Sequence, residues 1–230
     1  MQRLRVPEIM DDPSLPFEEH EKALRGVERL NMFSGSASII WWELRSLIKA
    51  SSAPVSILDI ATGSGDIPIA LAKEAKKLGV ELTIAGCDMS SRAIEIAKLK
   101  AKNAGVDIEY FVLNCMTEEV PRSFDVITTS LFTHHLDPPE VIRLIQAMQK
   151  HANKMFLIND LERSEFSYLG VWLATRLVTT SRVVQYDGPV SVRAAFTTDE
   201  FRKMAKSAGA KNISVESRFP CRLLLRGDIE

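Results

Sequence analysis

A carboxylate, two glycines and the start of a helix follow one another between residues 57 and 68 of this chain. The stretch reads ILDIATGSGDIP, in which an apolar run ends at Asp59 and is followed by Gly63 and Gly65. Glycines at such a turn let a ligand approach the bare backbone, and the N-terminus of the next helix adds N–H donors and a positive dipole end. These residue types predict a strand, a nucleotide-binding loop and a helix.

Two classes of nucleotide cofactor use a loop of this kind, and the order of the residues separates them. The dinucleotide fingerprint G-x-G-x-x-G requires a third small residue. Pro68 occupies that position here, and it has no N–H and cannot replace the glycine that permits close helix packing. The pattern Asp59-x-Ala61-x-Gly63-x-Gly65 instead resembles motif I of the class I S-adenosylmethionine-dependent methyltransferases, with Ala61 in place of the first glycine.

A second carboxylate, Asp88, ends the next apolar run, LTIAGCD. At a strand tip beside the glycine loop it can accept hydrogen bonds from two ribose hydroxyls, as it also would in a dehydrogenase. Asn114 follows the third strand, where the family usually has an aspartate; it can meet the amino edge of adenine or form a strand-end turn. The resemblance implies that S-adenosylmethionine and its product S-adenosylhomocysteine are bound by Asp59, Ala61, Thr62, Gly63, Ser64, Gly65, Asp88, Met89, Asn114, Cys115 and Ser130.

Half of the four histidines stand side by side, as His134 and His135, after the fourth apolar run. Methyl transfer to a hydroxyl requires removal of a proton, and an imidazole with a pKa near 6.5 suits a phenol with a pKa of about 10. Adjacent side chains point in different directions, so we expect one histidine to face the substrate. We assign the catalytic role to His134 before His135, which would then pack or form hydrogen bonds. The alternative that both only shape the loop stays open.

From Val55 onward, apolar runs alternate with amphipathic helices at intervals of roughly 25 to 30 residues, which a strand and a crossover helix require. The first of these helices is expected to have Asp66 as its N-cap and to end at Gly79. The expected strands comprise residues 55–59, 82–88, 108–113, 124–131 and 154–160, with a terminal hairpin over 212–219 and 221–225. The order predicts an α/β fold with a Rossmann-like, seven-stranded class I methyltransferase sheet whose last strand is antiparallel.

Two further segments flank this alternation. Residues 1–50 predict an N-terminal helical cap with an extended lead-in, and residues 51–230 a methyltransferase domain with a helical lid at about 162–196. The cap helices fit packing against the sheet equally well. The lid is expected to cover an apolar substrate pocket, whereas a dimer contact or a membrane-surface helix would also explain its apolar residues. Within the lid we expect substrate contacts from Tyr168, Trp172 and Arg176.

Composition limits the partners of this chain. Its 230 residues include 29 basic and 30 acidic ones, so no overall positive charge favours nucleic acid. The three cysteines form no CxxC pair, which suits a reducing compartment, argues against a zinc site and leads us to expect no metal. Without a signal peptide or a run of about 20 apolar residues, the sequence predicts a cytoplasmic protein with no transmembrane segment. A monomer and a homodimer are equally compatible with it.

Shorter motifs narrow the resemblance. Residues 131–136, 159–164, 187–189 and 195–197 resemble small bacterial methyltransferases of polyketide and phenolic-lipid pathways, and residues 59–66 also resemble the quinone-methylating group. The resemblance implies O-methylation of a small apolar hydroxylated aromatic, polyketide or phenolic lipid. C-methylation of a quinone-like acceptor, N-methylation and a non-catalytic cofactor-binding role remain alternatives. An NAD-dependent reductase would often carry a Tyr-x-x-x-Lys pair, which none of the three tyrosines forms.

Overall fold

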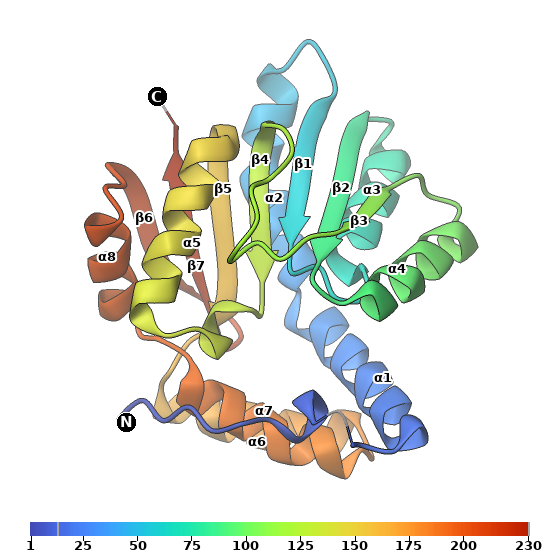
Figure 1. The fold of residues 1–230 in the computed structure, drawn as a ribbon, viewed down its shortest axis with the longest axis vertical. Coiled ribbons are helices and arrows are strands. Elements are labelled where there is room, and N and C mark those ends of the chain that lie inside the picture. The colour runs from blue at the N-terminus through green and yellow to red at the C-terminus, as the bar shows by residue number, and fades with distance from the viewer. Residues whose placement is uncertain (13, 230) are drawn as a thin grey trace.

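A seven-stranded sheet forms the centre of the protein (Figure 1). The computed structural model describes residues 1–12 and 14–229. The strand order is β3-β2-β1-β4-β5-β7-β6; β1 to β5 run parallel, and β7 is antiparallel to β5 and β6. The strands are β1 Val55–Ile60, β2 Leu82–Asp88, β3 Glu109–Val112, β4 Phe124–Ser130, β5 Ala152–Leu161, β6 Asn212–Arg218 and β7 Arg222–Asp228. The predicted class I sheet with an antiparallel last strand is confirmed.

Helices cover both faces of this sheet. Helices α2 (Ser36–Ala50) and α3 (Asp66–Leu78) pack on one face, with α4 (Ser91–Ala104) beside β3. Helices α5 (Pro138–His151) and α8 (Thr198–Ser207) cover the other face. The remaining helices, α1 (Phe17–Ser34), α6 (Glu165–Val178) and α7 (Arg182–Ala194), lie across the edge where the parallel strands end (Figure 1).

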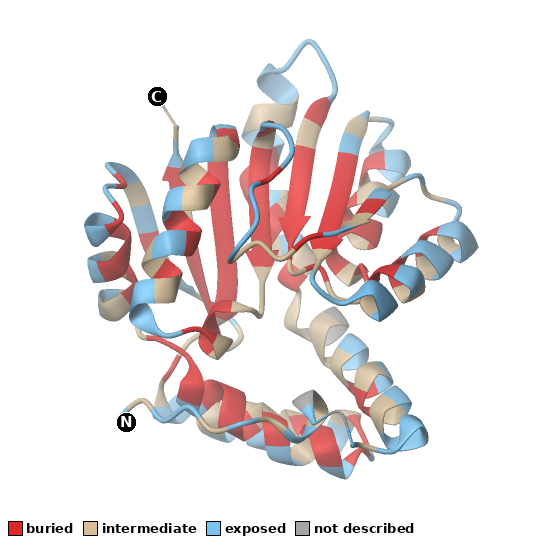
Figure 2. Cartoon of the chain, viewed as in Figure 1, coloured by how far each residue is buried: buried red, intermediate tan, exposed pale blue. Residues whose placement is uncertain are grey.

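Strand β1 is buried on both faces of the sheet, because a layer of helices packs against each face (Figure 2). Ile57 packs in one core with Ile40 of α2 and Leu71 of α3, whereas Leu58 belongs to the other core with Leu144 of α5. A continuous apolar run, rather than an alternating one, is what a parallel strand between two helical layers requires. The carboxyl ends of β1, β2 and β4 are held rigidly beside one another as a result.

The first crossover helix differs from the prediction at its start. Gly65, with a φ of 79°, is the N-cap of α3, and Asp66, which was expected in that role, is the first helical residue. The Asp66 carboxylate forms an ion pair with Lys100 of α4 instead. The left-handed φ favours glycine at this N-cap, and a Cβ on Gly65 would also lie 2.4 Å from the Tyr110 hydroxyl oxygen. Backbone conformation and packing both require glycine at this position.

The two N-terminal helices pack against different parts of the protein. Helix α2 belongs to the sheet core, while α1 contacts α6 and α7 and continues to Ser34, where Gly35 separates the two helices. Residues 1–12, which we call the N-terminal strap, run along α7. The backbone N–H groups of Ile9 and Met10 donate to the two carboxylate oxygens of Asp187 at 2.8 and 3.0 Å.

The lid predicted over residues 162–196 consists of α6 and α7, which pack against each other. Helix α6 is apolar around much of its surface, and Phe166, Leu169, Leu173 and Leu177 remain exposed. Within the described part of the chain, no helix combines the length and apolarity that crossing a membrane demands.

We expect Gly227→Ala to destabilise the hairpin side of the sheet. Gly227 is opposite Phe156 in the register of β5 and β7, and a Cβ there would lie 2.1 Å from a ring carbon of Phe156. Overpacking of this kind costs about 1–3 kcal/mol of unfolding free energy, measurable by urea denaturation. In the double variant with Phe156→Leu the loss should be smaller than the sum of the two single losses; additive losses would show that the two positions do not interact.

Candidate active site

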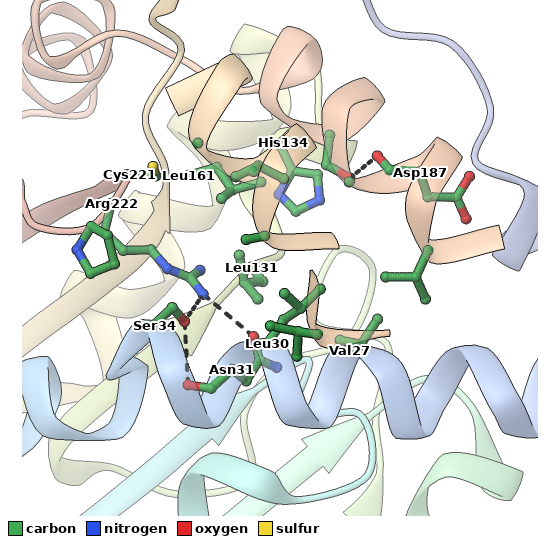
Figure 3. Close-up of a pocket in the computed structure, with 18 of the residues that line it drawn as sticks. Val27, Leu30, Asn31, Ser34, Leu131, His134, Leu161, Asp187, Cys221 and Arg222 are labelled. Atoms are coloured by element: carbon green, nitrogen blue, oxygen red, sulfur yellow. Dashed lines mark hydrogen bonds between the residues drawn. The ribbon is translucent and has the colours of Figure 1, made fainter. Parts of the chain in front are cut away.

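A cavity of about 390 Å³ lies between the sheet edge, helix α1, the strap and the lid (Figure 3). This volume is in the usual range of small-molecule sites. Most of the wall is apolar, and it includes Val27, Leu30, Leu131, Leu161, Val171, Ala174, Val178 and Val184. The polar side chains of the wall are Glu8, Asn31, Ser34, His134, His135, Asp187, Ser191 and Arg222.

His134 is held by a buried carboxylate at the end of β5. Its Nδ1 lies 2.7 Å from Oδ1 of Asp160, and its backbone N–H donates to Oδ2 of the same residue at 3.1 Å. The Thr133 hydroxyl and the Leu161 backbone N–H also donate to Asp160. Because the carboxylate accepts a hydrogen bond from Nδ1–H, it fixes the tautomer that leaves the Nε2 lone pair available. His134 is 4% exposed and lines the cavity.

The two members of this pair shift each other's pKa. Burial alone disfavours the imidazolium, but the charge and hydrogen bond of Asp160 outweigh it, and the pKa of His134 is raised above its usual 6.5. Burial likewise opposes the Asp160 carboxylate, yet His134 and the hydrogen bonds to the carboxylate hold the pKa of Asp160 well below its usual range. The pair therefore stabilises a proton on His134 and a charge on Asp160.

The second histidine has a different environment. Burial and the charge of His134 lower the pKa of His135 to about 4, so its ring is neutral near pH 7. The rings of His134 and His135 have centroids 4.2 Å apart. Glu8 lies beside them, with its Oε1 3.7 Å from Nε2 of His134. One ligand atom from each of the three residues lies within 4.8 Å of the others, so they could hold a cation; the ion pair between Glu8 and His134 accounts for the same proximity without one.

The strap brings Glu8 to the cavity. Arg3 of the strap donates to the backbone oxygens of Ala194 and Leu136, at 2.6 and 2.7 Å. This ties the strap both to the lid and to the loop that carries His134. Ser191 of α7 donates to Glu8 from the lid side. The proline-containing lead-in, to which the sequence analysis assigned no role, is therefore part of the site.

Most of the expected cofactor residues lie at the ends of β1 and β2, whereas Asn114 and Cys115 follow β3 and Ser130 ends β4. Gly63 donates its backbone N–H to Oδ2 of Asp88 at 2.9 Å, and Ser90 donates to Oδ1 at 2.9 Å. Each carboxylate oxygen of Asp88 can accept a further hydrogen bond. Gly63 has a φ of 54°, and a Cβ on it would meet no atom within 4 Å. The loop thus faces open space beside a carboxylate that retains acceptor capacity.

Asp59 acts inside this loop rather than at its surface. Its two carboxylate oxygens accept the Thr62 and Thr128 hydroxyls at 2.8 and 2.7 Å, and it is 1% exposed. Burial raises the pKa of Asp59 to about 6. Ala61 between Asp59 and Thr62 has a φ of 53°, a left-handed conformation that glycine adopts more easily. The glycine that the motif usually has at the position of Ala61 would therefore adopt this turn conformation with less strain.

The other expected cofactor residues differ in their exposure and in their hydrogen-bond partners. Met89 is 70% exposed beside Asp88, where it can present an apolar surface. The side-chain oxygen of Asn114 accepts the Met116 N–H at 3.0 Å, which is the turn-forming role that the sequence left open. Ser64 accepts a hydrogen bond from Lys100 at 3.2 Å. Cys115 is half-buried, and burial raises the pKa of its thiol to about 11. The Ser130 hydroxyl lies 3.4 Å from the Asn159 amide nitrogen.

The lid residues expected to contact substrate do not line the cavity. Tyr168, Trp172 and Arg176 form one stripe of α6, at four-residue spacing, and the guanidinium of Arg176 stacks 4.1 Å from the Trp172 ring. The cavity is instead lined by another stripe of the same helix, Phe166, Gly170, Ala174 and Val178, together with Val171. Two residues correspond to about 200° around a helix, so the expected stripe lies on the opposite side of α6.

The structure adds three site residues that the sequence analysis did not select. Glu8 lies in a lead-in with no periodic pattern, and Arg222 lies in a terminal strand with no motif. Asp160 did have a signal: like Asp59 and Asp88, it ends a predicted strand with a carboxylate. Carboxyl ends of parallel strands meet at one edge of a sheet, so Asp160 could have been placed near His134 from the strand order.

Comparison with known proteins agrees with this arrangement. Residues 57–154 match a family described as a methyltransferase domain. Ubiquinone biosynthesis O-methyltransferases of Pseudomonas entomophila (strain L48) and Pseudomonas putida (strain GB-1) are each 31% identical to this chain over 124 residues, or 53% of this chain and 50% of those proteins. The chain thus spans about half the length of the curated relatives it matches.

Solved structures match nearly the whole chain. The plantazolicin methyltransferase BamL, in complex with a triazolic desmethylPZN analog and SAH, has a TM-score of 0.69 at 20% identity, covering 94% of this chain and 92% of that one. Magnesium protoporphyrin IX methyltransferase from Synechocystis PCC 6803 has a TM-score of 0.60 at 15% identity, covering 96% and 91%. At these identities the likeness concerns the fold. Residues 57–154 thus match a methyltransferase domain, and the chain as a whole has the fold of these methyltransferase structures.

Proposed function

We propose that this protein transfers the methyl group of S-adenosylmethionine to a hydroxyl group of a small apolar acceptor, such as a hydroxylated aromatic, a polyketide or a phenolic lipid. The observation that carries the proposal is the buried His134–Asp160 pair on the wall of an apolar cavity. The names of the matched ubiquinone biosynthesis O-methyltransferases support oxygen as the acceptor atom.

The residues at the ends of β1 and β2 fit the cofactor. Asp88 would hold the ribose hydroxyls, and the glycine loop, which has open space at Gly63, would lie against the amino-acid end. Met89 and the Asn114–Cys115 turn would lie beside the adenine. When bound, the cofactor supplies a methyl group on a sulfonium, whose sulfur is already an excellent leaving group. The protein therefore contributes mainly alignment and removal of the acceptor proton.

His134 is the proton acceptor in this mechanism. Nε2 of His134 would take the proton of the acceptor hydroxyl as the oxygen receives the methyl group. The imidazolium that results is stabilised by Asp160 at Nδ1. Glu8, 3.7 Å from Nε2, can receive the proton afterwards. His135 is neutral and its ring lies tilted against that of His134, so it would orient the His134 ring rather than take the proton.

The cavity supports an apolar acceptor. We propose that α1, the strap and the lid of residues 162–196 together form the acceptor chamber, and that residues 51–230 without this lid form the cofactor-binding part. Valine, leucine and alanine side chains make up most of the wall. Burial of a hydrocarbon tail there would contribute about 25 cal/mol per Å² of apolar surface removed from water.

A turnover assay tests the proposal directly. The protein would be incubated with S-adenosylmethionine and a panel of alkylated phenols, with S-adenosylhomocysteine measured by mass spectrometry and the methyl position by NMR. Formation of an aryl methyl ether is expected. A product methylated on a ring carbon would establish C-methylation in its place, and absence of both turnover and cofactor binding would overturn the proposal.

We expect Asp88→Asn to weaken S-adenosylhomocysteine binding about tenfold or more, because the ribose hydroxyls lose a charged acceptor. Isothermal titration calorimetry measures this change. Asp125→Asn is a matched control: Asp125 also accepts two hydrogen bonds, from the backbone N–H and hydroxyl of Ser56, but at the opposite end of the sheet. Equal losses in both variants would show that Asp88 acts only on stability.

We expect His134→Ala to lower kcat about 100-fold or more with little change in cofactor affinity, because the acceptor proton loses its base. His135→Ala should lower kcat much less, since this ring only supports its neighbour. Steady-state kinetics on both variants, with thermal denaturation as a check of folding, compares them. Full turnover by folded His134→Ala would contradict the assigned role.

The pH dependence provides a separate prediction. His134 must be neutral to act as a base, so kcat/KM should rise with pH through a pKa above 6.5. Asp160→Asn removes the charge that raises this pKa, so the rising limb should move to lower pH. The plateau value of kcat/KM should also fall, because the substituted side chain would no longer stabilise the imidazolium or hold the neutral ring in its Nδ1–H tautomer. A limb that stays in place would show that another group controls the profile.

A further inference from the structure

The β6–β7 hairpin contains three arginines at equal spacing, and one of them lacks an ion pair. Arg218 pairs with Glu43 and Glu216 at 2.9 and 3.1 Å. Arg226 pairs with Glu43 and Asp228 at 3.0 and 2.8 Å. Arg222, which lies opposite Arg218 in the hairpin register, forms no ion pair with any residue that the structure describes. It is the most buried of the three, at 3% exposure.

The hydrogen bonding of Arg222 is also incomplete. Its Nη2 donates to the Ser34 hydroxyl at 2.5 Å and to the Asn31 side-chain oxygen at 3.4 Å. Its Nε and Nη1 are buried and have no acceptor among the described residues. A buried charge without a counter-ion costs several kcal/mol, and a buried donor without an acceptor adds to that cost. A guanidinium in this state is unusual for a purely structural arginine.

The charged side chains of the cavity wall are separated by sign, with a cation at one end and carboxylates elsewhere. Figure 3 shows the guanidinium of Arg222 at one end, over Asn31 and Ser34, and Asp187 at the other end, with His134 on the wall between them. Glu8 lies near His134. Asp160, the carboxylate that acts most on Arg222 through space, already accepts hydrogen bonds from Thr133, His134 and Leu161. A negative group of a ligand is therefore favoured only at the Arg222 end.

We propose that Arg222 binds the carboxylate of an acidic acceptor, so that the substrate class is a hydroxylated aromatic acid with an apolar tail. The carboxylate would supply the counter-ion and acceptor that the guanidinium lacks. The uncharged hydroxyl would then lie toward His134 and Glu8, where a second negative group is disfavoured. This inference deepens the proposed O-methyl transfer and rests on it for the assignment of the hydroxyl, but the carboxylate contact can be tested by binding alone.

The test compares ligands with and without a carboxylate on the same alkylated phenol ring. An alkylated hydroxybenzoate, its methyl ester and the corresponding alkylphenol would be titrated by calorimetry into the full chain with S-adenosylhomocysteine present. The acid should bind at least about tenfold more tightly than the ester or the phenol. Equal binding of the three ligands, or tighter binding of the ester, would overturn the inference without any variant.

Variants assign the effect to Arg222. Arg222→Gln should abolish the preference for the acid while leaving the affinity for the ester within about twofold, and Arg222→Lys, which keeps the charge, should retain part of the preference. Arg218→Gln is the matched control, because it removes a paired guanidinium of the same hairpin; it should keep the full preference. If Arg222→Gln lowered acid and ester binding alike, Arg222 would serve only to hold β7 and α1 together, and the inference would fail.

The turnover readout separates this inference from the proposed function. Acid preference without formation of S-adenosylhomocysteine would uphold the carboxylate site and overturn methyl transfer to these acceptors. Methylation of the phenol and the ester, together with equal binding of all three ligands, would uphold the proposed function and overturn the carboxylate site.

Discussion

The buried carboxylate of Asp160 is the constraint on which the site depends. It receives hydrogen bonds from the Thr133 hydroxyl, the His134 backbone, the His134 ring and the Leu161 backbone. A carboxylate 1% exposed is tolerated only with partners of this quality. These bonds fix the loop after β4 against the end of β5 and orient one imidazole. Leu131, at the start of that loop, accordingly adopts a left-handed φ of 55°, which is rare for a branched side chain.

The sheet and the loops after β1 and β2 were predictable because their signals are local. Continuous apolar runs, strand-end carboxylates and helix caps each follow from a few neighbouring residues. Ser90 caps α4, Gly105 ends it, and Thr197 with Glu200 forms the capping box of α8, as these residue types indicate. The motif around Asp59 is local in part: Thr62 belongs to the same turn, whereas Thr128, the other threonine that Asp59 binds, comes from β4 and lies 69 residues away in the chain.

The acceptor side was less predictable, because its residues meet only in three dimensions. Glu8, His134 and Arg222 come from the strap, the loop after β4 and the start of β7, and no spacing in the sequence links them. Helix α6 adds a second difficulty. Its apolar residues surround the helix, so periodicity does not indicate which stripe faces inward. Choosing the stripe with the aromatic and cationic side chains, Tyr168 to Arg176, led to the outer face.

The N-terminal strap has a consequence for how the protein folds. Ile9 bonds to Asp187 across 178 residues of chain, and Arg3 bonds to Ala194 across 191. Contacts of such separation gain little until the strands and helices between them are in place. We therefore expect the strap to dock late in folding, after the sheet has formed. We also expect release of the strap to open the cavity around His134 without unfolding the sheet. Such an opening would give a long apolar molecule a way into the cavity.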